Sequence, residues 1–167
     1  MLSERIQDIY NKENIKVRRI DFIDEQLDGI IIGNTVYESG RLETAHEQNV
    51  LRSHELMHYK TNPYNLMDAD KITQAKYERL AVRDTAQMLC PIDALIRLYF
   101  EYKRTPDEIA EELEITPKYV CSVLKYYAQA YGNTCRYKNY HIRFIPLEIR
   151  CEKKERRFLP SKQSYRR

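Results

Sequence analysis

Hydrophobic residues alternate with polar ones near both ends of the chain and recur every three or four positions between them. On the N-terminal side, residues 15–22 alternate, and the β-branched runs 30–32 and 35–37 flank a Gly-Asn pair at 33–34. Two such runs on either side of a two-residue glycine turn are typical of a β-hairpin. We therefore expect a small N-terminal β-sheet, preceded by a short amphipathic helix over residues 2–12.

The middle of the chain has the period of a helix. Thr44 and Glu47 fit a capping box, in which the threonine hydroxyl accepts from the backbone of Glu47 and the carboxylate reaches back to the cap. A helix that starts there should end near Asn62-Pro63, because proline cannot continue a helix. Three consecutive helices are expected, over residues 45–60, 71–89 and 93–102.

Two shorter helices with clear start signals follow. Thr105 and Thr116 each precede a proline, which favours the first position of a helix, and Gly132 marks the end of the second helix. Beyond it, residues 135–137 and 140–145 have the pattern of a terminal β-hairpin. The order of a small sheet, a helical centre and a short β ending predicts an α+β fold.

The 167 residues are enough for one compact domain, or for one domain with a small appendage. The four cysteines form no CxxC pair, and unpaired cysteines in a charged chain are typical of a reducing compartment. The N-terminus does not resemble a signal peptide, and no apolar run is long enough to cross a bilayer. We therefore expect a cytoplasmic protein that does not act at a membrane.

The net charge of +3 is unevenly distributed. Residues 150–167 contain eight basic and two acidic residues and so carry +6, which leaves −3 for residues 1–149. Nucleic-acid-binding domains usually carry clustered lysine and arginine. Nucleic-acid binding is therefore not expected of the main body. The basic tail is either a solvated C-terminus, which we favour, or the one part of the chain that could bind nucleic acid.

The pattern HExxH occurs at residues 54–58, well inside the first long helix. His54 and His58 project from the same helix face, so both rings can reach one zinc ion at about 2.0–2.1 Å. Glu55 is turned about 100° away from His54 and can instead take a proton from water at the ion. The alternative is a helix that carries two surface histidines and no ion.

A catalytic zinc needs a third protein ligand and one open position. Glu78 is the best candidate, because it heads a stripe with Ala81 and Thr85 that is small enough for two helices to approach closely. The alternative is a solvated Glu78 that pairs with a neighbouring arginine. Weaker ligand candidates are Asp68, Asp70 and Asp84; His46 lies too far along its helix, and His141 is expected to be an ordinary histidine.

Three segments resemble the ImmA/IrrE family of metallopeptidases, which is often found in phages and other mobile elements. Residues 50–59 (VLRSHELMHY) are similar to the family's LaHELGHy segment, and residues 78–91 (ERLAVRDTAQMLCP) to its ExxAxxFAaxLLmP helix. Residues 29–34 (GIIIGN) are similar to the strand before the active helix. Met57 and Asp84 replace the family's usual Gly and Phe, and neither belongs to the ligand set.

The resemblance implies a zincin-like helical core on which the N-terminal sheet packs. It implies that His54, His58 and Glu78 bind Zn²⁺ and that Glu55 is the general base. It also implies a protein substrate, a helix-turn-helix repressor whose cleavage would switch on a mobile element, as anti-repressors do.

Several features of such a peptidase stay open at the level of sequence. An extended substrate bound along an edge strand such as residues 30–37 would suit this activity. Tyr59 and Tyr77 are candidates for stabilising the oxyanion, and nothing in the sequence selects either. Two other functions use the same residues: a non-catalytic regulator that binds DNA or a repressor, and a component of a toxin–antitoxin pair.

Residues 105–131 resemble a helix-turn-helix, with apolar side chains at the expected buried positions. The first helix carries four acidic residues and the second offers only Lys118 and Lys125 as cations, so packing or partner docking is expected rather than DNA binding. We divide the chain into a metallopeptidase domain, an appendage with the helix-turn-helix-like pair and the hairpin, and the basic tail, at residues 1–103, 104–149 and 150–167.

Overall fold

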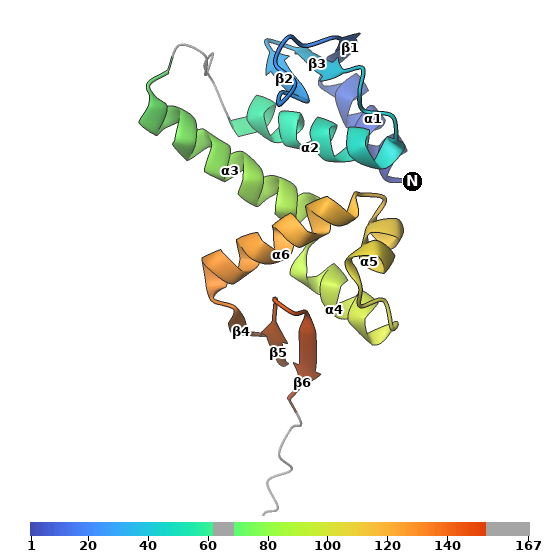
Figure 1. Cartoon of the computed structure of the whole chain (residues 1–167), viewed down its shortest axis with the longest axis vertical. Helices are drawn as coiled ribbons and strands as arrows, with labels where there is room; N and C mark the ends of the chain where they lie inside the picture. Colours follow the sequence, from blue (N-terminus) through green and yellow to red (C-terminus); the bar gives the residue numbers. More distant parts are fainter. Residues whose placement is uncertain (62–68, 153–167) are drawn as a thin grey trace, which may run out of the picture.

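Strands lie near both ends of the sequence and helices between them, so the fold is mixed α and β (Figure 1). The computed structural model describes residues 1–61 and 69–152. The helices are α1 (Leu2–Lys12), α2 (Ala45–Thr61), α3 (Lys71–Leu89), α4 (Ile92–Phe100), α5 (Pro106–Leu113) and α6 (Pro117–Tyr131). The strands are β1 (Lys16–Ile20), β2 (Gly29–Ile32), β3 (Thr35–Ser39), β4 (Thr134–Tyr137), β5 (Tyr140–Arg143) and β6 (Glu148–Cys151).

Three expectations concern residues outside the described part of the chain: the end of α2 at Asn62-Pro63, the ligand candidate Asp68, and the tail beyond Glu152. None of the described helices is long and apolar enough to cross a membrane.

The N-terminal sheet has the strand order β1-β3-β2, in which β1 runs parallel and β2 antiparallel to β3. The predicted hairpin is confirmed, and Gly33 has φ +60° in its turn, a conformation that glycine adopts without steric penalty. The expectation of an edge strand within residues 30–37 holds for β2 only. It is wrong for β3, because β3 lies between β1 and β2 and pairs with both.

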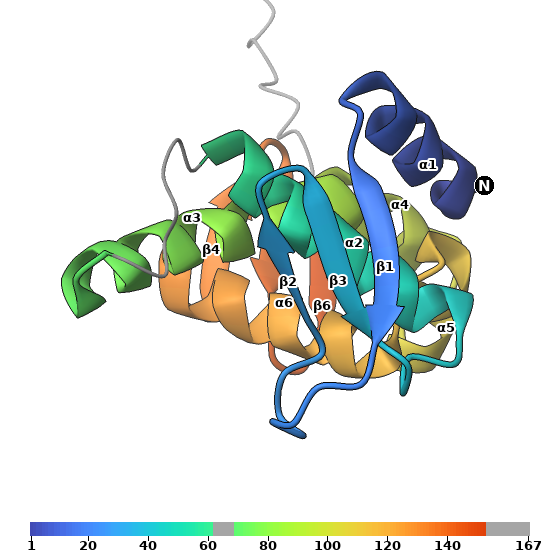
Figure 2. The same cartoon turned by 90° about the horizontal axis from the view of Figure 1, so that it is seen from above.

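Helix α2 lies beneath this sheet, with β2 on the side nearest α3 and β1 on the side nearest α1 (Figure 2). Gly29 allows β2 to approach α2 closely, because a Cβ at this position would lie 2.6 Å from a methyl carbon of Leu51. The capping box of α2 is confirmed: the Glu47 N–H donates to Thr44 Oγ1 at 3.2 Å, and the Thr44 N–H donates to the Glu47 carboxylate at 2.9 Å.

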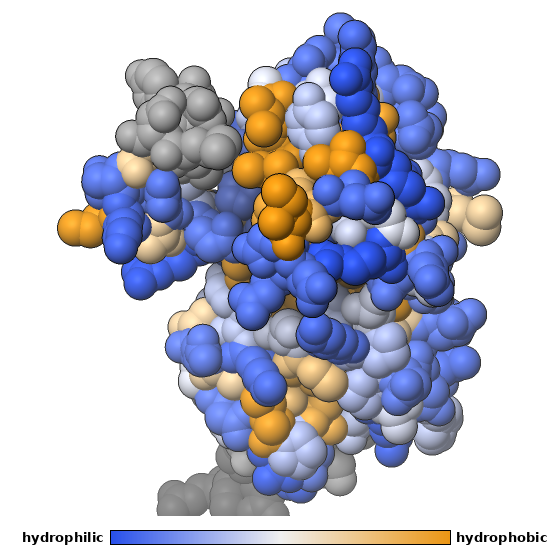
Figure 3. All heavy atoms as spheres, turned by 45° about the horizontal axis from the view of Figure 1, so that its top comes forward, coloured by the Kyte–Doolittle hydropathy of each residue, from blue (hydrophilic) through white to orange (hydrophobic). Residues whose placement is uncertain are grey.

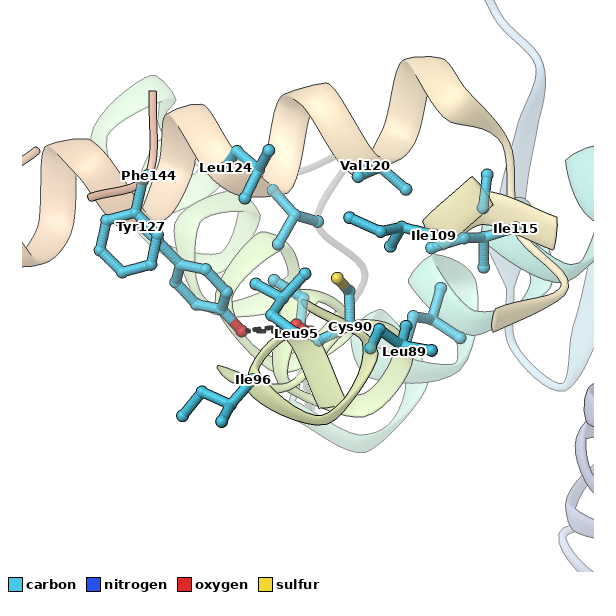
Figure 4. Close-up of a cluster of buried hydrophobic side chains, with 14 of the residues drawn as sticks. Leu89, Cys90, Leu95, Ile96, Ile109, Ile115, Val120, Leu124, Tyr127 and Phe144 are labelled. Carbon is cyan, nitrogen blue, oxygen red and sulfur yellow. Dashed lines mark hydrogen bonds between the residues drawn. The ribbon is translucent and has the colours of Figure 1, made fainter. Parts of the chain in front are cut away.

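Two hydrophobic cores hold the described part of the chain together. The first joins α1, the N-terminal sheet, α2 and α3; its buried residues are Ile6, Tyr10, Ile15, Val36, Leu56, Met57 and Ala81. The second joins the end of α3 to α4, α5, α6 and the C-terminal sheet (Figure 4). In this second core the buried Tyr127 hydroxyl donates to the Cys90 carbonyl at 3.0 Å, which satisfies its polar end.

The C-terminal strands form a three-stranded antiparallel sheet in the order β4-β5-β6, so the predicted terminal hairpin is incomplete. The third strand, β6, escaped prediction because it is short and has a single apolar residue, Ile149, between charged neighbours. Ile149 packs with Ile142 in the second core, and this tertiary contact compensates for the weak local signal. Arg150 and Cys151, assigned above to the tail, therefore belong to β6.

Helices α5 and α6 are the two short helices expected between residues 105 and 131, with the capping box at Thr105 and the cap at Thr116 both present. Glu114 lies in the turn with a left-handed backbone (φ 54°) and contacts the first half of the chain. Its carboxylate accepts from the Leu2 N–H, and its carbonyl accepts from Asn49 Nδ2 at 2.9 Å. Polar contacts therefore connect residues on both sides of the predicted domain boundary at 103–104. The boundary itself stays a prediction.

A buried ion pair fixes α2 to the sheet. Arg52 donates to both carboxylate oxygens of Glu38 on β3, at 2.9 and 3.0 Å, and Glu38 is only 3% exposed. Arg19 of β1 lies 3.6 Å from the same carboxylate. Two-point contact with a guanidinium stabilises a buried carboxylate in one geometry, so this pair orients α2 just before the HExxH segment.

Replacement of Arg52 by alanine should therefore lower the free energy of unfolding by about 3 kcal/mol, because it leaves Glu38 buried without its main partner. Urea unfolding followed by circular dichroism measures this change. Arg97→Ala, which removes an exposed ion pair with Glu101, is the matched control and should change stability by less than about 0.5 kcal/mol. Equal effects of the two substitutions would contradict the role given to Arg52.

Candidate metal centre

The candidate site lies where α2 packs against α3. Ala81 and Thr85 of α3 are fully buried, as expected for a stripe that lets two helices approach closely. Leu56 and Met57 of α2 are buried in the same core as Ala81. Because the small stripe brings the helices together, Glu78, one turn before Ala81, comes opposite the histidines of α2.

The structure brings together His54, His58 and Glu78. The Nε2 atoms of His54 and His58 are 3.0 Å apart, and their rings stand edge to face at 89°. One Glu78 oxygen lies 3.4 Å from His54 Nε2, and the other lies 3.1 Å from His58 Nε2. The side chains of the histidines are 25% and 13% exposed and that of Glu78 is 54% exposed, so the cluster is accessible from one side.

These residues fit a zinc ion in both chemistry and spacing. Two imidazoles and one carboxylate are a common donor set of catalytic zinc, and one atom from each lies within 4.8 Å of the others. Ligand atoms about 2.0–2.1 Å from a tetrahedral ion should be about 3.3 Å from one another, close to the separations given above. The same separations suit hydrogen bonds between protonated histidines and a carboxylate.

Glu78 and His54 influence each other's protonation. Hydrogen bonds from His54 and His58 hold the pKa of Glu78 well below its usual range, so this carboxylate stays ionised. Burial lowers the pKa of His54, but the hydrogen bond and charge of Glu78, together with the charge of Glu55, outweigh it and raise the pKa overall. The cluster therefore places an ionised carboxylate beside the imidazole nitrogens.

Glu55 is near this cluster but outside its donor set. It is only 5% exposed, and burial raises its pKa against the charges of His54 and His58 and a backbone hydrogen bond from Ile31, which all lower it. A raised carboxylate pKa is what a general base needs in order to accept a proton near neutral pH. The roles of the three residues as ligands and of Glu55 as base stay a prediction.

The other sequence candidates have different partners or positions. Asp70 caps α3 by accepting from the backbone N–H groups of Ile72 and Thr73, and Asp84 pairs with Arg83 at 2.7 Å. His141 lies in β5 and pairs with Glu152 at 2.6 Å. Glu78 itself contacts His54 and His58, which is not the arginine pairing considered as the alternative.

Some polar groups around the site were not found from the sequence. The Ile31 backbone meets Glu55, a contact that depends on how the sheet lies on α2 and leaves no trace in local sequence. His58 Nδ1, Ser53 Oγ and Thr85 Oγ1 are buried and have no hydrogen-bond partner among the described residues. A zinc ion on Nε2 would place the imidazole proton on Nδ1, where such ligands usually donate to an outer partner.

No protein-family model matches this chain, and a search of curated proteins finds no significant match. The geometry and chemistry of the described residues are therefore the basis for assigning a role to the site.

Glu78→Gln should weaken zinc binding more than about a hundredfold, because even outer partners of zinc ligands contribute 10- to 100-fold to affinity. Competition with a chromophoric chelator measures the affinity, and atomic emission measures the zinc content. Asp84→Asn, on the same helix, is the matched control and should bind zinc as the wild type does. Unchanged affinity in Glu78→Gln would show that another group is the third ligand.

Proposed function

We propose that this protein is a zinc-dependent peptidase that cleaves a protein partner. The observation that carries the proposal is the meeting of His54, His58 and Glu78 beside a buried Glu55. Histidines and a carboxylate as ligands, with a separate carboxylate of raised pKa, are the parts needed to activate water for attack on an amide. A purely structural zinc site would instead use four protein ligands and no adjacent base.

A small sheet over the HExxH helix, and a following helix that carries Glu78, support a zincin-like arrangement. His54, His58 and Glu78 would hold the ion. When bound, zinc polarises the scissile carbonyl and lowers the pKa of water. Glu55 accepts a proton as the water oxygen bonds to the carbonyl carbon. It then delivers that proton to the leaving nitrogen as the C–N bond breaks, which returns Glu55 to its ionised form.

No described strand pairs with the outer edge of β2, and this edge is the best place for an extended substrate. Pairs in an antiparallel ladder alternate between hydrogen-bonded and non-hydrogen-bonded, and a two-residue turn normally closes on a hydrogen-bonded pair. Here the closing pair is Ile32–Thr35, so the backbone groups of Ile31, one step away, point outward from β3. The Ile31 N–H contacts Glu55, so a peptide added along this edge would pass beside the base.

The outer face of this edge is apolar. Ile31 packs in the first core, so its neighbours Ile30 and Ile32 face outward, and Ile32 is 46% exposed. Figure 3 shows apolar side chains gathered in this upper part of the molecule. Substrate residues that point to the same side would pair with these isoleucines across the strands. We therefore expect the protein to prefer substrates with apolar, β-branched residues at alternate positions.

The partner we propose is a helix-turn-helix repressor, as the resemblance to ImmA/IrrE metallopeptidases implies. In this role the peptidase would act as an anti-repressor of a mobile element. The support for this substrate is the resemblance of residues 50–59 and 78–91, joined by the site that these two segments form.

Glu55→Gln should keep the zinc content of the wild type and lower peptide hydrolysis at least about a hundredfold, the usual contribution of a general base. Hydrolysis of a random-sequence peptide mixture is followed by mass spectrometry, and zinc by atomic emission. Glu43→Gln, an exposed glutamate just before α2, is the control and should behave as the wild type. Hydrolysis retained in Glu55→Gln would exclude this mechanism, and a wild type with zinc but without hydrolysis would favour the non-catalytic regulator.

Ile32→Glu should raise the KM for peptides with alternating apolar residues about two- to fivefold and leave kcat unchanged, because a cross-strand pair contributes about 0.2–1 kcal/mol. Ile20→Glu is matched to it, since Ile20 is similarly exposed (37%) but lies on the opposite edge strand, β1. Equal changes in the two variants would place the substrate elsewhere.

A further inference from the structure

The C-terminal sheet has one apolar face and one charged face. Residues Cys135, Ile142 and Ile149 point toward the second core, where Ile142 and Ile149 are buried. Side chains on a strand alternate between faces, so the opposite face carries the residues between them. These are Thr134 and Arg136 of β4, His141 and Arg143 of β5, and Glu148 and Arg150 of β6.

The register places three basic side chains abreast on this outer face. Arg136 pairs with His141, and His141 pairs with Arg150, so the three stand on neighbouring strands about 4.8 Å apart. Their side chains are 65%, 54% and 82% exposed. Arg136 and Arg150 therefore flank His141 on the exposed face of the sheet.

The basic side chains of this face form ion pairs with two carboxylates, Glu148 and Glu152. Glu152 contacts both Arg136 and His141 at 2.6 Å, and Glu148 contacts Arg143 and, at 3.7 Å, Arg150. Exposed ion pairs of this kind contribute little to stability, so the guanidinium groups can exchange a carboxylate for another anion. Arg150, the most exposed of them, has the longest of these contacts.

We propose that this outer face binds the phosphate backbone of double-stranded nucleic acid without sequence preference. Arginine forms two-point hydrogen bonds with phosphate oxygens, and a row of exposed arginines can contact successive phosphates. The face carries no Phe, Tyr or Trp, because Tyr137 and Tyr140 point to the other side with Cys135 and Ile142. Binding of single strands usually requires such aromatic side chains for base stacking, so a duplex is the favoured ligand.

The sequence that follows adds charge of the same sign. Residues 153–167 contain seven basic residues and one acidic residue, and they continue directly from β6 through Glu152. The helix-turn-helix-like pair offers much less: α5 carries four acidic residues, and the exposed cations of α6 are Lys118 and Lys125. The surface is thus distinct from the recognition helix of a helix-turn-helix. It also lies at the opposite end of the molecule from the N-terminal sheet (Figure 1).

Fluorescence anisotropy of the full chain with a short random-sequence DNA duplex, over a range of salt concentrations, tests this proposal. The double variant Arg136→Gln/Arg150→Gln should bind about tenfold more weakly. The slope of log affinity against log salt should fall by about two, since each phosphate contact contributes about 0.9. The matched control, Lys118→Gln/Lys125→Gln, removes the same charge from α6 and should bind as the wild type does.

A second pair, Arg156→Gln/Arg157→Gln, separates the sheet face from the residues that follow it. The proposal fails if only this pair weakens binding, if the α6 control weakens it as much as the sheet pair does, or if the wild type shows no salt-dependent binding. It also fails if a single strand or anionic phospholipid vesicles bind as tightly as the duplex. A duplex RNA probe then tells whether DNA is preferred, and circular dichroism confirms that each variant is folded.

Discussion

Helices α2 and α3 touch along a line where α3 carries Ala81 and Thr85, and the absence of large side chains there sets the distance between the two helices. Glu78 precedes this line by one turn and meets His54 and His58 only at that separation. A larger residue at position 81 or 85 would move the carboxylate away from the imidazoles. The donor set is therefore a consequence of packing as much as of the HExxH spacing.

Two buried carboxylates, Glu38 of β3 and Glu55 of α2, have opposite environments. Glu38 accepts two hydrogen bonds from Arg52, so its charge is compensated, and it fixes α2 to the sheet. Burial, the largest effect, raises the pKa of Glu55, whereas the charges of His54 and His58 and one backbone N–H lower it. A compensated carboxylate suits a structural role, whereas one with a raised pKa suits proton transfer. Helix α2 thus carries both Arg52, which ties it to Glu38 of the sheet, and Glu55, the proposed base, within a few residues.

The two hydrophobic cores lie in different parts of the chain, and hydrogen bonds join these parts. The second core holds the C-terminal sheet with one face buried, which leaves the arginine-bearing face exposed. Glu114 and Asn49 connect the turn between α5 and α6 to α1 and α2. The N-terminal sheet beside the proposed peptidase site and the proposed phosphate-binding face lie at opposite ends of the molecule (Figure 1).

The sequence alone determined the helices and their starts. Caps such as Thr44, Thr105 and Thr116 form hydrogen bonds with backbone groups only three residues away, so they do not depend on the rest of the fold. It also determined the spacing of His54 and His58 on one face, and the small stripe below Glu78 pointed to the third member. Only the tertiary structure decided that β3 is central, that β6 pairs with β5, and that Ile31 meets Glu55. These features depend on contacts between residues far apart in the chain, for which short strands carry almost no local pattern.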